Sequence, residues 1–493
     1  MIAYEQYLEL RSKIAAYQLA LTTLHWDGAT VAPKQGAAYR SQKMGILSGE
    51  MFSIMTDEKT ISLLREALSE SLDDVQLKEV KQSLKNILDV VNVPKETYIE
   101  FVTLQNEAEH IWEQAKSRND YAMFKPYLKK LIEMTKNMLS YRNSSLSVYE
   151  QLLDDFEEGM RITDYDAFFN EIKEKLVPFI SKLLDTKLTA PAFLNAHVSE
   201  DEQRRLIDYL AQVLEYDLES GTIAKSIHPF SSHFSNHDNR VTVRYLKNQM
   251  TSSIFAFIHE VGHATYNSQV TPAFEGLTVS QSMTYGLHES QSRLFENLIG
   301  KTKAFWQPHY EHIQTIISAL KNVSLDKFII GINYVEQSFI RVEADELTYP
   351  LHIMLRYELE KALFEGSLSV DELPNEWNNK FKEYLNLDIT NDEHGVLQDV
   401  HWSGAAFGYF PTYALGSAYG AMFFEAMNEA INVEEALLNN NFKVIKNWLR
   451  ENIHHFGGLY NGKDLIRKIC LKPFSAQSYI DGLITKYSAL YQL

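Results

Sequence analysis

The chain has 493 residues and a formal net charge of −18, from 47 Lys and Arg against 65 Asp and Glu. This acid excess, without a clustered basic run, argues against a nucleic-acid partner and favours a soluble surface. The 21 Gly and 12 Pro fall below the usual shares of about 7% and 5%, which predicts long helices and few tight turns. Cys470 is the only cysteine, which excludes an intrachain disulfide and a thiolate zinc site and fits a reducing compartment.

Two stretches bear on targeting to a membrane. The N-terminus carries Glu5 and Glu9 where a signal peptide would have an apolar core. The uncharged run 402–424 is long enough to cross a bilayer, but four Gly, one Pro and several polar residues interrupt it. We interpret it as a buried loop that leads into a helix. We therefore expect a soluble, cytoplasmic protein with no membrane partner.

Helical patterns dominate the first 190 residues. An amphipathic helix is expected over residues 1–25, followed by a turn near Pro33. Apolar residues between Ile61 and Val91 recur at helical spacing, and another helix is expected around Tyr98–Ala115. We expect these helices to pack mainly on one another. An all-α fold class follows from this pattern.

The middle of the chain contains one exception to helix. Ser199 and Glu202 have the spacing of a capping box and predict a helix start. Alternation and β-branched residues in Arg240–Tyr245 predict a short strand just upstream of a histidine-bearing helix. Because no repeat or flexible linker occurs, we expect one domain over residues 1–493. It would have two lobes around a cleft, with an N-terminal helical region of about 1–190 and catalytic motifs in 228–402.

The stretch Ile254–Ala264 is an apolar helical segment that contains two histidines and one glutamate. Residues four apart lie on the same helix face, so His259 and His263 can bind one ion. Glu260 lies about 100° around the axis and flanks that ion. H-E-x-x-H is the pattern of a zinc site whose glutamate is a general base. Gly262 costs about 1 kcal/mol relative to Ala inside a helix, which indicates a close neighbour.

A catalytic zinc site needs a third protein ligand and an open position. The segment Gly286–Glu296 offers two carboxylates. Glu289 is the predicted ligand, whereas Glu296 lies two turns further along and is predicted to lie on the solvated or inter-helix side. His288 and Gln291 are candidates for supporting the site or contacting the substrate.

These residue types predict hydrolysis of a peptide bond. Glu260 would take a proton from a zinc-activated water and pass it to the leaving amine. The tetrahedral oxyanion needs further donors, and His401, Tyr409 and Tyr413 in a Gly-aromatic loop are candidates. Each of these three residues is also consistent with simple packing.

Six motifs occur in a fixed order between residues 228 and 402. They are His228-Pro229-Phe230, Asp238-Asn239-Arg240-Val241-Thr242, His259-Glu260-x-x-His263, His288-Glu289-Ser290-Gln291, Ile340–Asp345 and Gly395–Trp402. With them the sequence resembles the carboxypeptidase Taq family of metallocarboxypeptidases. The resemblance implies an all-helical fold with a single deep cleft, shared with neurolysin-like and angiotensin-converting peptidases. It also implies a homodimer, one divalent ion (zinc or cobalt) and removal of single residues from peptide C-termini. Position by position, it implies His259, His263 and Glu289 as metal ligands and Glu260 as the general base.

A carboxypeptidase must hold the free carboxylate of its peptide substrate, which a bidentate arginine does best. Arg341 and Arg356 are the candidates, although nearby acids such as Glu343, Asp345, Glu346 and Glu358 could hold either arginine in a structural ion pair. The predicted strand could bind the peptide as an added strand, or it could simply cover the zinc helix. The remaining predicted substrate-binding residues are His228, Asp238, Arg240, Thr242, His288, Gln291, Gln398 and Asp399.

A second expectation concerns Asp399, and two more histidines are predicted to have no role as ligands. Asp399 is expected to orient a histidine, as carboxylates around metal sites do. His233 and His237, between the first two motifs, are expected to be surface residues and not ligands.

Two alternatives stay open at this point. An oligopeptidase that cuts inside short peptides would use the same chemistry, and it would cleave a peptide and its C-terminal amide equally. A metal-stabilised helical scaffold that binds peptides without cutting them is the second alternative. It predicts that Glu260→Gln leaves every measurable property unchanged.

Overall fold

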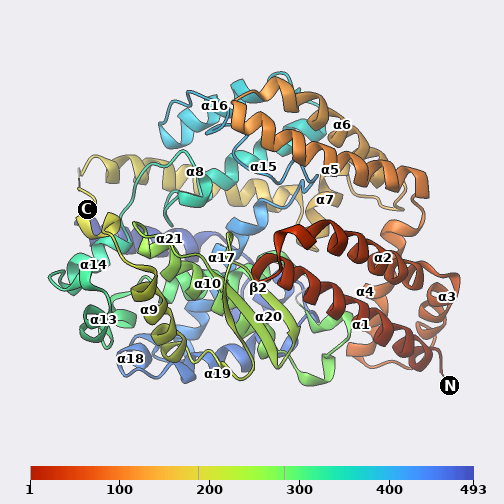
Figure 1. The fold of residues 1–493 in the computed structure, drawn as a ribbon, viewed down its shortest axis with the longest axis horizontal. Helices are drawn as coiled ribbons and strands as arrows, with labels where there is room; N and C mark the ends of the chain where they lie inside the picture. Colours follow the sequence, from red (N-terminus) through yellow and green to blue (C-terminus); the bar gives the residue numbers. More distant parts are fainter. Residues whose placement is uncertain (1, 187, 282–283) are drawn as a thin grey trace.

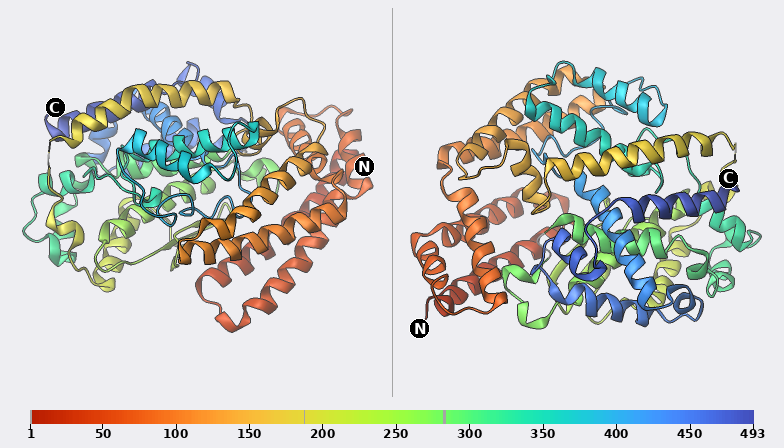
Figure 2. Two further views of the ribbon diagram at one scale, coloured as in Figure 1. Left: turned by 90° about the horizontal axis from the view of Figure 1, so that it is seen from above. Right: turned by 180° about the vertical axis from the view of Figure 1, so that it is seen from behind.

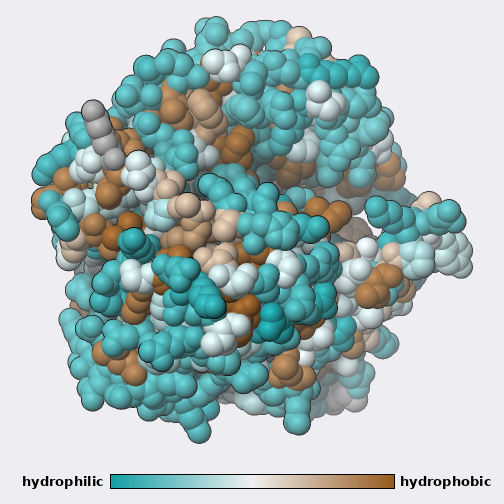
Figure 3. Space-filling view, turned by 60° about the vertical axis from the view of Figure 1, so that its left-hand side comes forward, coloured by the Kyte–Doolittle hydropathy of each residue, from teal (hydrophilic) through white to brown (hydrophobic). Residues whose placement is uncertain are grey.

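The computed structural model describes residues 2–186, 188–281 and 284–493 (Figure 1). These residues form 21 α-helices and one sheet of three short strands, which confirms the all-α fold class. Among the helices described, none combines the length and the apolar character needed to span a bilayer. One face of the molecule is mostly hydrophilic with smaller hydrophobic areas between, in keeping with the net charge of −18 (Figure 3).

The first 213 residues are helical apart from their connections. The bounds are α1 (Ala3–Thr30), α2 (Ala37–Thr56), α3 (Glu58–Ala67), α4 (Asp74–Val91), α5 (Lys95–Arg118), α6 (Tyr121–Ser140), α7 (Val148–Phe156), α8 (Ile162–Leu184) and α9 (Glu200–Val213). The predicted helices over 1–25 and 98–115 are confirmed, and the pattern over 61–91 divides into α3 and α4. The predicted capping box is present, since Ser199 accepts from the backbone N–H of Glu202 directly before α9.

Helices α1, α3 and α4 enclose a small hydrophobic core of their own. Tyr7, Leu64 and Val80 are buried in it. These helices and α2 lie at one end of the molecule in all three ribbon views (Figures 1 and 2). The buried carboxylate of Glu79 joins them to the remainder, because it accepts from Tyr7 Oη at 2.7 Å and from the backbone N–H of Val279 at 3.0 Å.

The sheet consists of β1 (Ile223–Lys225), β2 (Ser231–Ser235) and β3 (Asp238–Val243) in the order β1-β3-β2. β3 is the predicted strand, starting two residues earlier than expected. It pairs in parallel with β1 and antiparallel with β2, so both of its edges are occupied. The interpretation of this strand as the acceptor of a peptide strand is therefore wrong. The alternative is confirmed, because β3 packs on the histidine-bearing helix α10 (Met250–Ser268).

The C-terminal half of the chain supplies most of the larger hydrophobic core, which also includes residues of α5 to α9. Its helices are α11 (Tyr285–Arg293), α12 (Lys303–Trp306), α13 (Tyr310–Ile316), α14 (Leu325–Ile332), α15 (Tyr349–Glu365), α16 (Leu373–Leu385), α17 (Pro411–Ala430), α18 (Val433–Leu438), α19 (Phe442–Asn452), α20 (Gly462–Cys470) and α21 (Gln477–Tyr491). A π-helical turn, η5 (Leu294–Ile299), continues α11 without a break. The run 402–424 forms a loop followed by the buried helix α17, as predicted.

Helix α17 lies very close to α11 because glycines face it. A Cβ built on Gly416 would lie 2.6 Å from Cγ of Glu289, and one on Gly420 would lie 3.0 Å from the carbonyl oxygen of Ser290. Side chains at these positions would push the two helices apart. The packing of α17 therefore helps to fix where Glu289 lies.

Candidate metal centre

Three predicted ligand side chains meet between α10 and α11. Nε2 of His259 and Nε2 of His263 lie 3.6 Å and 3.5 Å from Oε2 of Glu289. Donor atoms about 2.0–2.2 Å from a tetrahedral zinc ion are about 3.4 Å apart. The spacing of the three donors therefore fits a single ion of this kind, whose fourth position water or substrate would take.

Glu289 presents one oxygen to the histidines because its other oxygen is occupied. Nε of Arg293, one turn further along, donates to Oε1 at 2.8 Å, and Oγ of Ser292 lies 3.2 Å from Oε2. Burial by itself would raise the pKa of Glu289, but Arg293 and the two histidines outweigh burial and hold that pKa well below its usual value. Glu289 is thus a carboxylate, the form that binds a cation.

Glu296 lies on the inter-helix side, one of the two positions predicted for it, but it has a specific partner there. Its Oε2 accepts from Nδ1 of His259 at 2.9 Å and from Nη1 of Arg293 at 3.1 Å. Metal-binding histidines commonly donate their second N–H to a carboxylate, which fixes the tautomer and turns Nε2 towards the ion. Glu296 is in position to play this part for His259, a role that its place in the sequence did not predict.

The local charges favour a cation at this position. Burial lowers the pKa of His259, but Glu289 and Glu296 outweigh burial and raise that pKa to about 9. Burial by itself would raise the pKa of Glu296, but Arg293 outweighs burial and lowers that pKa to about 2. Glu289 and Glu296 are therefore both charged. A field that stabilises a proton on His259 also stabilises a divalent ion, which supports the fit of the donor set.

Glu260 lies beside the ligand histidines on α10 and is almost fully buried. Burial raises the pKa of its carboxyl group. His259 and His263 oppose this, and so, to a smaller extent, does a hydrogen bond from the hydroxyl of Ser231 on β2. Glu260 and His259 line a cavity of about 560 Å³ that extends towards residues 334–345. A substrate carbonyl bound in this cavity would lie beside His259, one of the predicted ligands, and the predicted base Glu260.

The close neighbour predicted for Gly262 is the backbone of α11. A Cβ at this position would lie 2.7 Å from both the carbonyl oxygen of Gln291 and Cα of Ser292. Only a residue without a side chain lets α10 and α11 approach this closely. Gly262 therefore sets the distance between the helix with the two histidines and the helix with Glu289.

We expect Gly262→Ala to destabilise the protein by about 1–3 kcal/mol, because backbone atoms of α11 must move to make room. Gly45→Ala in α2 is the matched control, since nothing lies within 4 Å of its Cβ position. It should stabilise the protein by about 0.5–1 kcal/mol through helix propensity. Urea unfolding of both variants measures the difference, and equal behaviour of the two would contradict the tight packing described for Gly262.

His288 and Gln291 support the site from within the protein. The His288 ring stacks on His263 with centroids 4.4 Å apart, and its Nε2 lies 3.1 Å from Oδ1 of Asn267. Burial holds the pKa of His288 well below its ordinary value, so the ring is neutral. Gln291 has no exposed surface and pairs with Nε2 of His454 at 2.8 Å, which argues against direct substrate contact.

The two candidate carboxylate-binding arginines share one aspartate. Asp399 accepts from Nε of Arg341 at 2.9 Å and from Nε of Arg356 at 2.7 Å. The structural ion pair left open by the sequence thus exists, but with Asp399 and not with the four nearer acids. The expectation that Asp399 orients a histidine is wrong, since within the described residues its hydrogen bonds go to these arginines. Arg356 is fully buried and also donates to the carbonyl of His352, which argues against contact with a substrate.

The oxyanion-donor candidates form an aromatic cluster beside Arg341. Oη of Tyr413 lies 3.5 Å from Nε2 of His401. Burial, reinforced by Arg341, lowers the pKa of His401 to about 4, so the ring is neutral at pH 7. Burial raises the pKa of Tyr409 to about 12 and that of Tyr413 well above its usual value, so both hydroxyls keep their protons. Tyr413 lies three residues before Gly416 on α17, the glycine that packs against Glu289.

The first two motifs hold each other in place. Thr242 is fully buried, and its Oγ1 accepts from the backbone N–H of Phe230 at 2.9 Å, which ties the His-Pro-Phe loop to β3. Asp238 binds the guanidinium of Arg240 through two hydrogen bonds of 2.7 and 2.6 Å. Thr242 therefore acts on the loop and not on a substrate. Substrate contact stays a prediction for His228, which is exposed, and for Asp238 and Arg240.

Gln398 forms hydrogen bonds with the backbone around Arg341. Its Oε1 accepts from the backbone N–H of Arg341 at 3.0 Å, and its amide group donates to the carbonyls of Phe339 and His394. Gln398 thus fixes the backbone that carries Arg341. A direct contact of Gln398 with substrate stays a prediction.

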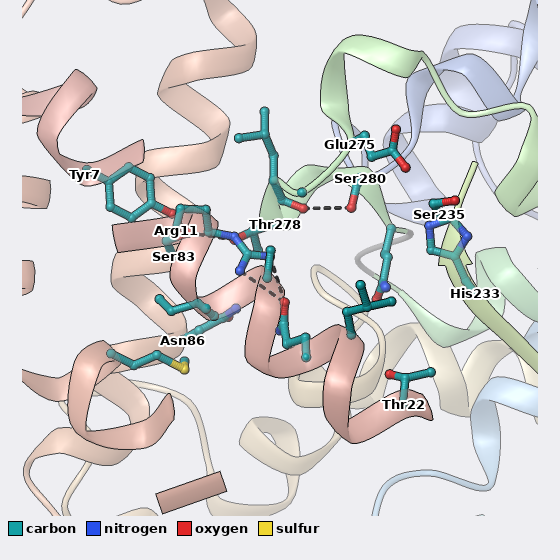
Figure 4. Close-up of a pocket in the computed structure, with 18 of the residues that line it drawn as sticks. Tyr7, Arg11, Thr22, Ser83, Asn86, His233, Ser235, Glu275, Thr278 and Ser280 are labelled. Atoms are coloured by element: carbon teal, nitrogen blue, oxygen red, sulfur yellow. Dashed lines mark hydrogen bonds between the residues drawn. The ribbon is translucent and has the colours of Figure 1, made fainter. Parts of the chain in front are cut away.

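A second cavity of about 460 Å³ lies between α1, α4, β2 and residues 275–281 (Figure 4). Arg11 donates to Oε1 of Gln18, two turns along α1 on the cavity wall, and the ring of His233 borders the cavity. The prediction that His233 is a surface residue is wrong, because it is partly buried and Nδ1 pairs with Oδ1 of Asn239 at 2.8 Å. His237 is exposed as expected. The lining of this cavity includes none of the predicted site residues.

Three residues to which the sequence pattern assigns no role lie against the predicted site. Arg293, His454 and Ser231 each contact a predicted site residue. Arg293 had a usable signal, since it is four residues after Glu289 on the same helix face. His454 is 163 residues from its partner in sequence and belongs to no motif, so only the fold reveals it.

A helical protein with an H-E-x-x-H helix, and with a carboxylate on a neighbouring helix as the third candidate ligand, is of the metallopeptidase class. Comparison with known proteins agrees. The family model described as "Carboxypeptidase Taq (M32) metallopeptidase" matches residues 6–487. Carboxypeptidase 1 of Bacillus subtilis (strain 168) is 39% identical, and thermostable carboxypeptidase 1 of Thermus thermophilus is 34% identical, each over 99% of both chains. The crystal structure of an M32 carboxypeptidase from Deinococcus radiodurans R1 has a TM-score of 0.97 at 29% identity over 100% of both chains.

The chain therefore belongs to the carboxypeptidase Taq (M32) family of metallopeptidases. The predicted family and enzyme class are confirmed. The protein is a metallocarboxypeptidase, a hydrolase that acts on peptides, and its family implies a divalent metal ion. The scaffold alternative without catalysis is thereby set aside.

Proposed function

We propose that this protein removes single amino acids from the C-termini of peptides, with one zinc ion per chain held by His259, His263 and Glu289. The observation that carries the proposal is the approach of both Nε2 atoms to Oε2 of Glu289, at 3.6 and 3.5 Å. When bound, the ion lowers the pKa of a water molecule and polarises the substrate carbonyl. Cobalt suits the same nitrogen and oxygen donors and is the second candidate metal.

The protein groups then divide the proton transfers. Glu260 takes a proton from the attacking water and returns it to the leaving amine. Tyr413 and His401 donate hydrogen bonds to the oxyanion, which their protonated hydroxyl and neutral ring permit. Arg341 holds the terminal carboxylate of the substrate, and Asp399 keeps the guanidinium in place.

The organisation of the protein is part of the same proposal. We place it in the cytoplasm, where its single cysteine needs no disulfide partner. Residues 1–493 act as one domain of two lobes around the cleft, and two chains form a homodimer, as the motif resemblance implies. Light scattering of the purified protein measures the number of chains.

A mixed peptide pool analysed by mass spectrometry tests the function. We expect a ladder of products, each shorter by one C-terminal residue, that disappears with a chelator and returns with zinc. Peptides with a C-terminal amide should resist cleavage because they lack the charged carboxylate that Arg341 is proposed to hold. Internal fragments, or equal cleavage of acid and amide forms, would favour the oligopeptidase alternative instead.

A further inference from the structure

One guanidinium connects both carboxylates of α11 and its π-helical continuation η5. Arg293 donates through Nε to Oε1 of Glu289 at 2.8 Å and through Nη1 to Oε2 of Glu296 at 3.1 Å. The guanidinium lies over the ring of Tyr349, 4.6 Å from its centroid, and is largely buried. Three contacts on one rigid fork leave Arg293 little freedom to move.

The same contacts reach the second helix of the site. Oε2 of Glu296 accepts from Nδ1 of His259 on α10 at 2.9 Å, so Arg293 and His259 donate to one oxygen atom. Hydrogen bonds thus connect His259 to Glu289 through Glu296 and Arg293. His259 and Glu289, at the two ends of this chain of contacts, are both predicted ligands. The ligands from two helices are therefore oriented by one residue that is not a ligand itself.

The backbone supports this arrangement at one point. Residues 294–299 form a π-helical turn directly after Arg293, and Glu296 lies within it. π-Helical turns are rare and are frequently found at functional sites. The turn follows α11 at the point where the two carboxylates must face one guanidinium.

We propose that Arg293 is a positioning residue that restricts Glu289 to a single metal-binding oxygen and, through Glu296, fixes the orientation of His259. The inference rests on the metal site proposed above. Because Nε of Arg293 occupies Oε1, only Oε2 of Glu289 faces the histidines. A carboxylate limited to one oxygen keeps the coordination number low and leaves room for water and substrate.

Metal affinity and the visible spectrum of the cobalt-loaded protein test this proposal. Arg293→Met keeps the length and apolar contact of the side chain but removes its donors. We expect about 10- to 100-fold weaker zinc binding, measured by competition with a chromophoric chelator. Cobalt absorption should fall, because Oε1 becomes free to bind and a higher coordination number weakens the visible bands. A purely structural ion pair would not change that spectrum.

Conservative variants test the two hydrogen bonds that Arg293 donates, to Glu289 and to Glu296. Arg293→Lys keeps the charge, but a single ammonium cannot repeat the fork geometry, so intermediate affinity is expected. Glu296→Gln keeps an acceptor for His259 and should bind zinc more tightly than Glu296→Ala. These variants give the same two readouts if Arg293→Met does not fold.

Two controls make the result decisive. Arg205→Met removes an arginine with the same spacing to a helical acid, Asp201 at 3.1 Å on α9, and should leave zinc affinity and cobalt spectrum unchanged. His263→Ala should lose zinc binding altogether. Zinc affinity within about twofold of the wild type and an unchanged cobalt spectrum in Arg293→Met would overturn the inference. Full zinc binding by His263→Ala would instead overturn the proposed metal site.

Discussion

Replacement of Glu260 by Gln is expected to lower kcat by about 10²- to 10⁴-fold, the usual contribution of a general base. The amide has nearly the same shape, so the helix and its histidines stay in place, but it cannot accept a proton. The nearly complete burial of Glu260 and its contact with Ser231 argue for one defined position beside the substrate. Steady-state kinetics on a short peptide, with the bound metal quantified in the same sample, measures the effect.

The matched control is Glu358→Gln, a partly buried glutamate on α15 that pairs with Lys380 at 2.6 Å. This variant should keep the wild-type kcat. A loss of metal from Glu260→Gln would mean that Glu260 supports the ion and not the proton transfer. Activity within about threefold of the wild type at full metal loading would contradict its role as the base.

Loss of one ligand is expected to abolish both metal binding and activity. His263→Ala leaves two donors, His259 and Glu289, and a catalytic site of this kind needs three. Wild-type protein gains about 2.7 kcal/mol of stability at a free zinc concentration 100 times the dissociation constant, because zinc binds the folded state. The variant should gain none, which thermal unfolding with and without zinc measures.

His237→Ala serves as the control for this experiment, since His237 is exposed between β2 and β3. It should keep activity and the full stabilisation by zinc. Stabilisation of His263→Ala equal to that of the wild type would place the ion elsewhere in the protein.

The parts of the site that depend on local spacing follow from the sequence. The i,i+4 histidines share a helix face whatever surrounds them, and Gly262 indicates a close helix before any partner is known. The capping box of α9 is equally local, since Ser199 and Glu202 are three residues apart. Glu289 is predicted because a carboxylate from a second helix is the common third ligand beside two such histidines.

The parts that depend on long-range packing do not follow from it. Strand pairing places β3 in the middle of the sheet, and no single strand reveals its neighbours. The partner of Arg341 and Arg356 is Asp399. From the sequence, acids much nearer to the two arginines are equally able to pair with them. Glu296 contacts His259 across the interface between α10 and η5. The spacing of residues along a single helix cannot reveal such a contact.

A zinc titration of chelator-treated wild-type protein tests the central claim most directly. Peptidase activity and bound zinc are measured on the same samples. If His259, His263 and Glu289 form one catalytic site, activity rises in proportion to bound zinc and reaches its plateau at one ion per chain. Full activity in protein without bound metal, or activity that rises only after a second ion binds, would contradict that claim.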